Sequence, residues 1–198
     1  MNSIQYFVLA NQMDKALVYL SDFSKVLRSS LVNATFRMVH MDQEIDFLNS
    51  YLRLEQMRFP DKFDYIIQGF DKEDVRSLLM PPMLVQPFAE NAIRHGFMNL
   101  ESKGHLSIEF EKAGKDLLKC SITDNGIGRE KARKAEQLQL QNDRQHSGMI
   151  TESRIRLFNP SDLPAKYQLI YTDLSENGKP CGLRVELYLP MEMIGDHN

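Results

Sequence analysis

The chain has 198 residues, a net charge of −3 and 42% hydrophobic residues. This length suits one domain of ordinary size or two small ones, and the composition excludes disordered, collagen-like and coiled-coil-only proteins. The charge gives no sign of electrostatic binding to nucleic acid, and no apolar run reaches the about 18 residues of a membrane span. Cys120 and Cys181 each lie in an alternating apolar segment. We expect small buried side chains there, not a disulfide framework, a metal site or a redox site.

Apolar residues recur every three or four positions in two stretches of the first sixty residues, which predicts two amphipathic helices. The first stripe comprises Leu17, Leu20, Phe23, Leu27 and Leu31, and the second Met41, Ile45, Leu48 and Leu52. A shorter helix precedes them and ends near Asn11. The second stripe has further apolar residues beside it, so its helix should be packed on two sides. Asp42 is a candidate cap at its start.

After Pro60 the apolar period changes to two, which is typical of half-buried strands. The alternating segments cover residues 63–67, 106–110, 118–122, 167–171 and 183–189. One helix is expected from about Val85 to His95, with Pro87 in its first turn and Gly96 ending it. The alternation predicts an antiparallel sheet with helices on one face. The fold class is therefore α+β, a two-layer α/β sandwich behind a helical segment.

Residues 129–150 differ in composition from the rest of the chain. A charged run gives way at residues 137–145 to a stretch dominated by Gln. Such a segment buries little apolar surface and should be mobile. Because it lies between two glycine-containing motifs, it is either a lid over a ligand or an ordinary surface loop.

The segment from Glu90 to Gly96 contains an amide, a cation and an imidazole at Asn91, Arg94 and His95. On an α-helix these three positions share one face. The amide oxygen could hold a hard cation and the guanidinium could bind phosphate oxygens. Alternatively, they form a polar outer face, where a helix end favours cationic side chains.

Residues 122–128 follow a predicted strand and read Ile-Thr-Asp-Asn-Gly-Ile-Gly. The carboxylate of Asp124 could accept a hydrogen bond from an exocyclic amine, and Gly126 and Gly128 allow the backbone to approach a ligand closely. The same residue types are also common in turns. Further along the chain, Ser147 or Gly148 could open a helix whose amides bind an anion, or could simply cap it.

The order of these motifs resembles the ATP-binding domain of the GHKL superfamily, the Bergerat fold of histidine kinases. The segment 81–96 is similar to its N box and 124–128 to its first glycine box. Residues 39–59 resemble the stretch that joins the helices to the catalytic domain in LytS-type sensor histidine kinases. The resemblance covers about residues 2–190.

The resemblance implies ATP and Mg2+ as cofactors. Asn91 would hold Mg2+ between the phosphates, and Glu90 would orient a water or polarise the reacting group. Arg94 and His95 would face phosphate or ribose.

At the other end of the nucleotide, Asp124 would accept from the adenine amine, with Thr123 assisting through a water. Gly126 and Gly128 would let the lid fold over the nucleotide. Gly148 and the following helix resemble the later glycine motif, with a spacing shorter by one residue.

The resemblance also implies an organisation: residues 1–58 as a truncated helical dimerisation and phosphoacceptor region, 59–192 as the ATP-binding catalytic domain and 193–198 as a tail. Kinases of this kind phosphorylate a histidine and relay the group to the receiver domain of a response regulator. That histidine would lie just upstream of Met1, and His40 is an alternative acceptor.

We therefore expect the cytoplasmic part of an inner-membrane sensor, a protein histidine kinase that forms a homodimer through its N-terminal helices. It would not bind nucleic acid directly and would reach the membrane only through the missing upstream part. Two alternatives stay open. One is a degenerate nucleotide-binding signalling module that acts by dimerisation and partner binding without phosphotransfer. The other is a different GHKL ATPase, such as a Ser/Thr-directed anti-sigma kinase.

Overall fold

The computed structural model of the protein describes residues 3–70, 72–129, 151–159, 166–176 and 178–194. Its helices are α1 (Ser3–Leu9), α2 (Met13–Asn33), α3 (Met41–Arg58), α4 (Lys72–Ser77), α5 (Gln86–Asn91) and the π-helix η1 (Ala92–Phe97), and residues 151–156 are also helical. None of the described helices is long and apolar enough to cross a membrane. The predicted lid, including Ser147 and Gly148, lies outside the described residues except for Arg129.

Five strands form the main sheet in the order β2-β4-β5-β7-β6, and a small sheet has the order β1-β3-β8. The bounds are β1 (Val39–His40), β2 (Phe63–Gln68), β3 (Leu78–Met80), β4 (Gly104–Lys112), β5 (Leu117–Asp124), β6 (Gln168–Glu176), β7 (Lys179–Pro190) and β8 (Glu192–Met193). All five predicted strands are confirmed. The prediction of a purely antiparallel sheet is wrong, because β2 and β4 are parallel. Their connection passes through α4, β3, α5 and η1, and such a long crossover is what parallel neighbours require.

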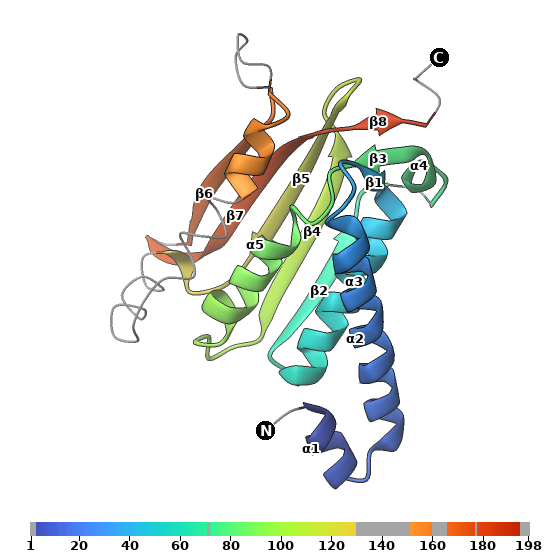
Figure 1. The fold of residues 1–198 in the computed structure, drawn as a ribbon. Helices are drawn as coiled ribbons and strands as arrows, with labels where there is room; N and C mark the ends of the chain where they lie inside the picture. Colours follow the sequence, from blue (N-terminus) through green and yellow to red (C-terminus); the bar gives the residue numbers. More distant parts are fainter. Residues whose placement is uncertain (1–2, 71, 130–150, 160–165, 177, 195–198) are drawn as a thin grey trace.

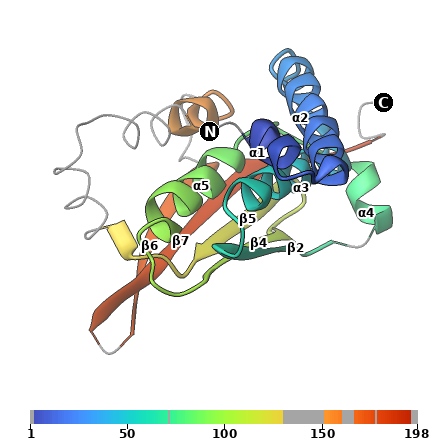
Figure 2. The ribbon, with the colours of Figure 1, turned by 90° about the horizontal axis from the view of Figure 1, so that it is seen from below.

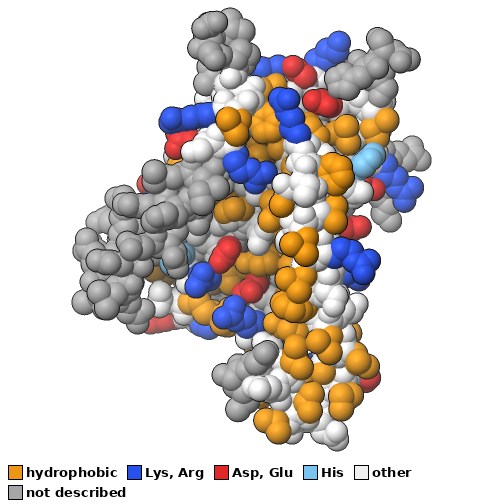
Figure 3. All heavy atoms as spheres, in the orientation of Figure 1, with side chains coloured by type: hydrophobic (Ala, Val, Ile, Leu, Met, Phe, Trp, Pro, Cys, Tyr) orange, Lys and Arg blue, Asp and Glu red, His pale blue; other side chains and the backbone are white. Residues whose placement is uncertain are grey.

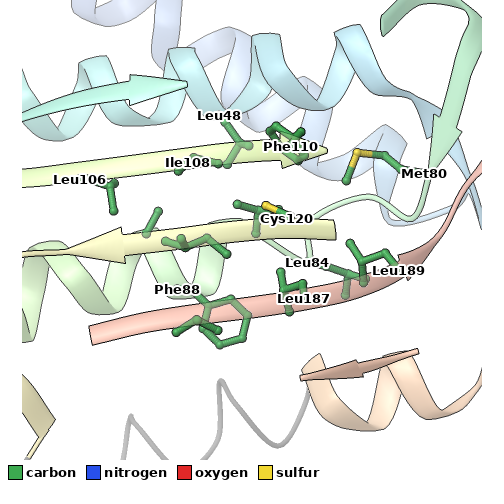
Figure 4. Close-up of a cluster of buried hydrophobic side chains, with 14 of the residues drawn as sticks. Leu48, Met80, Leu84, Phe88, Leu106, Ile108, Phe110, Cys120, Leu187 and Leu189 are labelled. Carbon is green, nitrogen blue, oxygen red and sulfur yellow. The ribbon is translucent and has the colours of Figure 1, made fainter. Parts of the chain in front are cut away.

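The helices α3 and α5 and the helical residues 151–156 lie on one face of the main sheet, as Figures 1 and 2 show. Between the layers lies one hydrophobic core, to which α3, α5 and the central strands all contribute (Figure 4). In β5 every second side chain is buried, which places Cys120 inside the core, whereas Cys181 is only partly buried. The predicted α+β class and its two layers are confirmed.

The helix α3 is packed on two sides, as its broad apolar surface predicts. Leu48 and Leu52 on its inner side belong to the core and are fully buried. On its outer side α3 packs against α2. Arg53 of α3 donates two hydrogen bonds of 3.0 Å to the buried carboxylate of Asp22 in α2. The cap prediction is wrong, because His40 occupies the N-cap and Asp42 lies within the first turn.

The apolar stripe of α2 does not cover the sheet. Leu17, Leu27 and Leu31 are 60%, 49% and 75% exposed. Figure 3 shows hydrophobic side chains gathered in a band along α2, on the side turned away from the sheet. The helix is amphipathic as predicted, but its apolar face is left open within the single chain.

Candidate functional site

The helix α5 and its continuation η1 place the predicted polar residues. Pro87 in the first turn is compatible with the helix, and Phe88, Ala89, Ile93 and Phe97 anchor one side of it in the core. From Ala92 the backbone forms the wider π-helical turn, in which the amide of Met98 donates to the carbonyl of Ile93 at 3.3 Å. The helix therefore continues beyond Gly96, where the sequence predicted its end. Segments of π-helix are frequent at functional sites.

The four polar residues of this segment lie on its less buried side. Arg94 donates to the carboxylate of Glu90 at 2.9 Å, and Asn91 and His95 are partly buried. The predicted common face of Asn91, Arg94 and His95 assumed 3.6 residues per turn, and the wider π-helical turn changes that spacing. The partner that the structure gives Arg94 within this segment is Glu90.

The end of β5 meets this helix through two glycines. A Cβ atom at Gly126 would lie 2.6 Å from the Cα of Gly96, so the two backbones touch where neither residue has a side chain. The amide of Ile127 donates to the carbonyl of Gly96 at 3.4 Å. The amide of Gly126 donates to the carboxylate of Asp124 at 2.8 Å. The two motifs, 33 residues apart at Asn91 and Asp124, are brought together, with the mostly buried Asp124 at the junction.

Neighbouring strands fix the end of β5, where Asp124 lies, and the loop that follows it. The side chain of Asn125 accepts a hydrogen bond of 2.6 Å from the amide of His105 at the start of β4. On the other side, a Cβ at Gly182 of β7 would lie 1.9 Å from the carbonyl oxygen of Asp124. Gly182 has a φ of +142°, a conformation that favours glycine. The sequence analysis missed Gly182, although a glycine within an alternating strand is a signal of close backbone approach.

One described residue that was predicted to bind the ligand, Thr123, is not brought to this junction. In β5 the side chain of Thr123 points to the sheet face opposite that of Asp124, and its hydroxyl oxygen accepts from Arg184 at 3.2 Å. Gly148 lies outside the described residues. Gly128 has a φ of +76° and packs against Pro180 directly after the loop. The predicted roles of these residues stay predictions.

The helix α3 faces the acidic end of α5. Burial raises the pKa of Tyr51, and the nearby carboxylates of Glu55 and Glu90 raise it further. Burial also raises the pKa of Glu55, which Arg58 opposes and Glu90 reinforces. Glu90 therefore lies close enough to Tyr51 and Glu55 of α3 for its charge to act on both groups.

A second group of residues, which the sequence analysis did not single out as a site, lies before α5. Glu44 of α3 is fully buried, and burial raises its pKa to about 7, against the opposing effects of a hydrogen bond from Met83 and the charge of Arg154. The amide of Met83 donates to Glu44 at 3.0 Å. The sequence signal for this group is Glu44 itself, an acidic residue among the apolar positions of α3.

The residue types at this junction have the chemistry that a purine nucleotide would need. Asp124 offers a carboxylate acceptor, and the contact of Gly96 with Gly126 keeps the surface beside it free of side chains. Asn91, Arg94 and His95 offer an amide, a cation and an imidazole. Among the described residues no group of three or more His, Cys, Asp or Glu could hold a metal ion alone. A divalent cation at Asn91 would need further oxygen ligands from phosphates and water, which is how Mg2+ is usually bound.

Comparisons with known proteins find similar sequences and folds. The family model described as "Histidine kinase" matches residues 1–63. The sensor histidine kinase/phosphatase LytS of Staphylococcus aureus strain MRSA252 is 32% identical over 127 residues, which is 64% of this chain and 21% of that protein. The same protein of strain Mu50 matches with the same identity and coverage. The aligned part thus spans about a fifth of the length of these relatives.

Solved structures have the same fold. The histidine kinase domain of the blue-light activated histidine kinase of Erythrobacter litoralis EL346 superimposes with a TM-score of 0.53 at 12% identity, covering 92% of this chain and 82% of that one. The mycobacterial sensor histidine kinase MprB gives a TM-score of 0.51 at 13% identity, covering 79% and 98%. At such low identity the likeness establishes the fold alone.

Proposed function

We propose that the chain belongs to the histidine kinase family and that it is the catalytic, ATP-binding part of a two-component sensor histidine kinase. Residues 59–192 would bind Mg-ATP, residues 1–58 would form the dimerisation and phosphoacceptor region, and 193–198 would be a tail. The observation that carries the proposal is the contact between Gly96 and Gly126, which joins Asp124 to the segment 90–95.

The adenine end of the site would be set by Asp124. Adenine presents an amino group where guanine presents a carbonyl oxygen, so a carboxylate acceptor favours adenine. The carboxylate is held in place by the amide of Gly126 at 2.8 Å and by the strand contacts of Asn125 and Gly182. A fixed acceptor of this kind selects a base without having to reorganise on binding.

The phosphate end would be set by α5 and η1. The amide oxygen of Asn91 would hold Mg2+, which when bound neutralises charge between the phosphates. Arg94 and His95 would face phosphate or ribose oxygens. Glu90, which pairs with Arg94 at 2.9 Å, would orient a water or polarise the reacting group. Gly148 would contribute from the part of the chain beyond the described residues.

Transfer of the γ-phosphoryl group would go to a histidine upstream of Met1, and then to an aspartate in the receiver domain of a response regulator. Catalysis of this kind rests on positioning and charge neutralisation. The exposed apolar stripe of α2 supports a homodimer through the N-terminal helices, because exposed patches of this kind mark interaction surfaces. This part would lie in the cytoplasm, and a membrane sensor would precede it.

Calorimetric titration with ATP and GTP, with and without Mg2+, tests the proposal. We expect saturable binding that prefers ATP. Asp124→Asn should weaken ATP binding about tenfold or more, since hydrogen bonds to charged groups are the stronger ones. Asn91→Ala should remove mainly the Mg2+-dependent part of the affinity. The control Asp64→Asn changes an exposed carboxylate of β2 that pairs with Lys103, and it should bind ATP as the unmodified chain does.

The other outcomes favour the alternative functions. No binding at millimolar ATP, a limit of about −4 kcal/mol, favours a degenerate signalling module that acts through dimerisation and partner binding. Binding of ATP combined with phosphorylation of serine or threonine in a partner favours a different GHKL kinase. Extending the chain upstream and detecting acid-labile phosphohistidine there supports the histidine kinase.

A further inference from the structure

Two ionisable side chains from different elements, the buried Glu44 and the partly buried Arg154, hold the same backbone turn, which comprises residues 81–83. From α3, the carboxylate Oε1 of Glu44 accepts a hydrogen bond of 3.0 Å from the amide of Met83. From the helical residues 151–156, Arg154 donates to the carbonyl of Pro82 at 2.8 Å and to that of Met83 at 3.3 Å. The amide and the carbonyl of Met83 are therefore both bound by side chains.

The turn needs such support. Met83 has a φ of +57°, a left-handed conformation that disfavours residues with a Cβ atom. Backbone of this kind persists only where the surrounding structure over-determines it, and it is found preferentially at functional sites. The hydrogen bond that Glu44 accepts and the two that Arg154 donates supply that constraint.

The two charges also depend on each other. Glu44 is fully buried, and its Oε2 has no hydrogen-bond partner within the described part of the chain. The positive charge of Arg154 lowers the pKa of Glu44, and the charge of Glu44 raises the pKa of the Cys120 thiol in β5. Removing Arg154 therefore takes away a cation that stabilises the ionised form of Glu44.

The turn is well placed to transmit movement. It ends three residues before α5, the helix that carries Glu90 and Asn91. Arg154 belongs to the helical residues that follow segment 130–150 in the chain, and Glu44 belongs to α3. A displacement of α3 would therefore act on the backbone that leads directly into α5.

We propose that Glu44 and Arg154 are positioning residues that lock the turn 81–83 and thereby couple α3 to the nucleotide site at the end of α5. This inference rests on the proposed function for its nucleotide readout. It assigns these two side chains a role through backbone placement, not through contact with a ligand. In a kinase dimer, the coupling lets the arrangement of the helical region set the affinity of the site.

Four variants test the coupling. Glu44→Leu removes the acceptor and the charge, and Arg154→Met removes the donors. Glu44→Gln retains an acceptor for the amide of Met83. Arg156→Met is the matched control, because Arg156 lies on the same helix, is exposed and pairs only locally with Glu152 at 2.8 Å. The readouts are the Kd for Mg-ATP and the hydrogen exchange of the amides in residues 81–91.

We expect Glu44→Leu and Arg154→Met each to raise the Kd about fivefold or more and to speed exchange in residues 81–91. Glu44→Gln should stay within about twofold of the unmodified chain, as should Arg156→Met. In the double variant the two losses should not add, because both act on one turn.

Unchanged Kd and exchange in Glu44→Leu and Arg154→Met would overturn the proposal, and so would strictly additive losses. If Glu44→Leu does not fold, Arg154→Met decides the question. If the unmodified chain binds no nucleotide, the proposed function fails, whereas the exchange of residues 81–91 still decides whether the turn is locked by this pair.

Discussion

The buried carboxyl of Glu44 makes a quantitative prediction for stability against pH. Its pKa is raised from 4.5 to about 7, chiefly by burial, while the hydrogen bond from Met83 and the charge of Arg154 oppose the shift. Between these two pH values the folded chain holds a proton that the unfolded chain has released. The free energy of unfolding contributed by this group is therefore fully present below pH 4.5 and is lost as the pH rises to about 7. Since one pKa unit corresponds to about 1.4 kcal/mol, the loss is about 3 kcal/mol.

Glu44→Gln removes the titration but keeps the shape of the side chain. Urea unfolding followed by circular dichroism at pH 5, 6, 7 and 8 measures the effect. The free energy of unfolding of the unmodified chain should fall relative to that of Glu44→Gln by about 2–3 kcal/mol as the pH rises across this range, and the difference should then level off. Asp46→Asn, an exposed change on the same helix, should follow the unmodified chain. Parallel pH curves for Glu44→Gln and the unmodified chain would refute the reasoning.

Two further predictions concern the glycine contact and α2. Gly126→Ala should lower the free energy of urea unfolding by about 1–3 kcal/mol, because its Cβ would lie 2.6 Å from the backbone of Gly96. Gly96→Ala should lower it little, because its Cβ would meet its neighbours only at 3.5 Å. Equal losses in the two variants would contradict this reasoning. The double change Leu27→Glu and Leu31→Glu, at exposed positions of α2, should lower the concentration-dependent mass in sedimentation without changing the circular dichroism spectrum, and an unchanged mass would count against pairing through this face.

The strands and helices could be predicted from the sequence because their signals are local. Alternation along β5 follows directly from the two faces of a strand, and Leu118 and Ile122 are buried as that pattern requires. The parallel pairing of β2 with β4 has no local signal, because it depends on the path of the chain between them. Asp42 was predicted as the cap from its residue type, but α3 begins two residues earlier than that cap implies, directly after His40.

The candidate site was predictable in part for the same reason. Gly126 was predicted to allow close backbone approach, and the structure places it against Gly96, which the sequence indicated only as a helix end. The π-helical turn of η1 could not be foreseen, because residues of the same polarity pattern fit an α-helix equally well. The left-handed conformation of Met83 could not be predicted from the sequence, because methionine has no preference for a positive φ.

The helical segment of α5 and η1 is fixed at both ends by interactions of different kinds. Before it, the amide and carbonyl of Met83 are held by charged side chains from two other elements. At its far end, Gly96 rests on Gly126 without any intervening side chain. Between them Ala89 and Ile93 are fully buried in a close-packed core, which resists bending. A segment with a rigid middle should respond to a shift of the turn mainly as one body. The placement of Asn91 should therefore depend on the hydrogen bonds that Glu44 and Arg154 make to the turn.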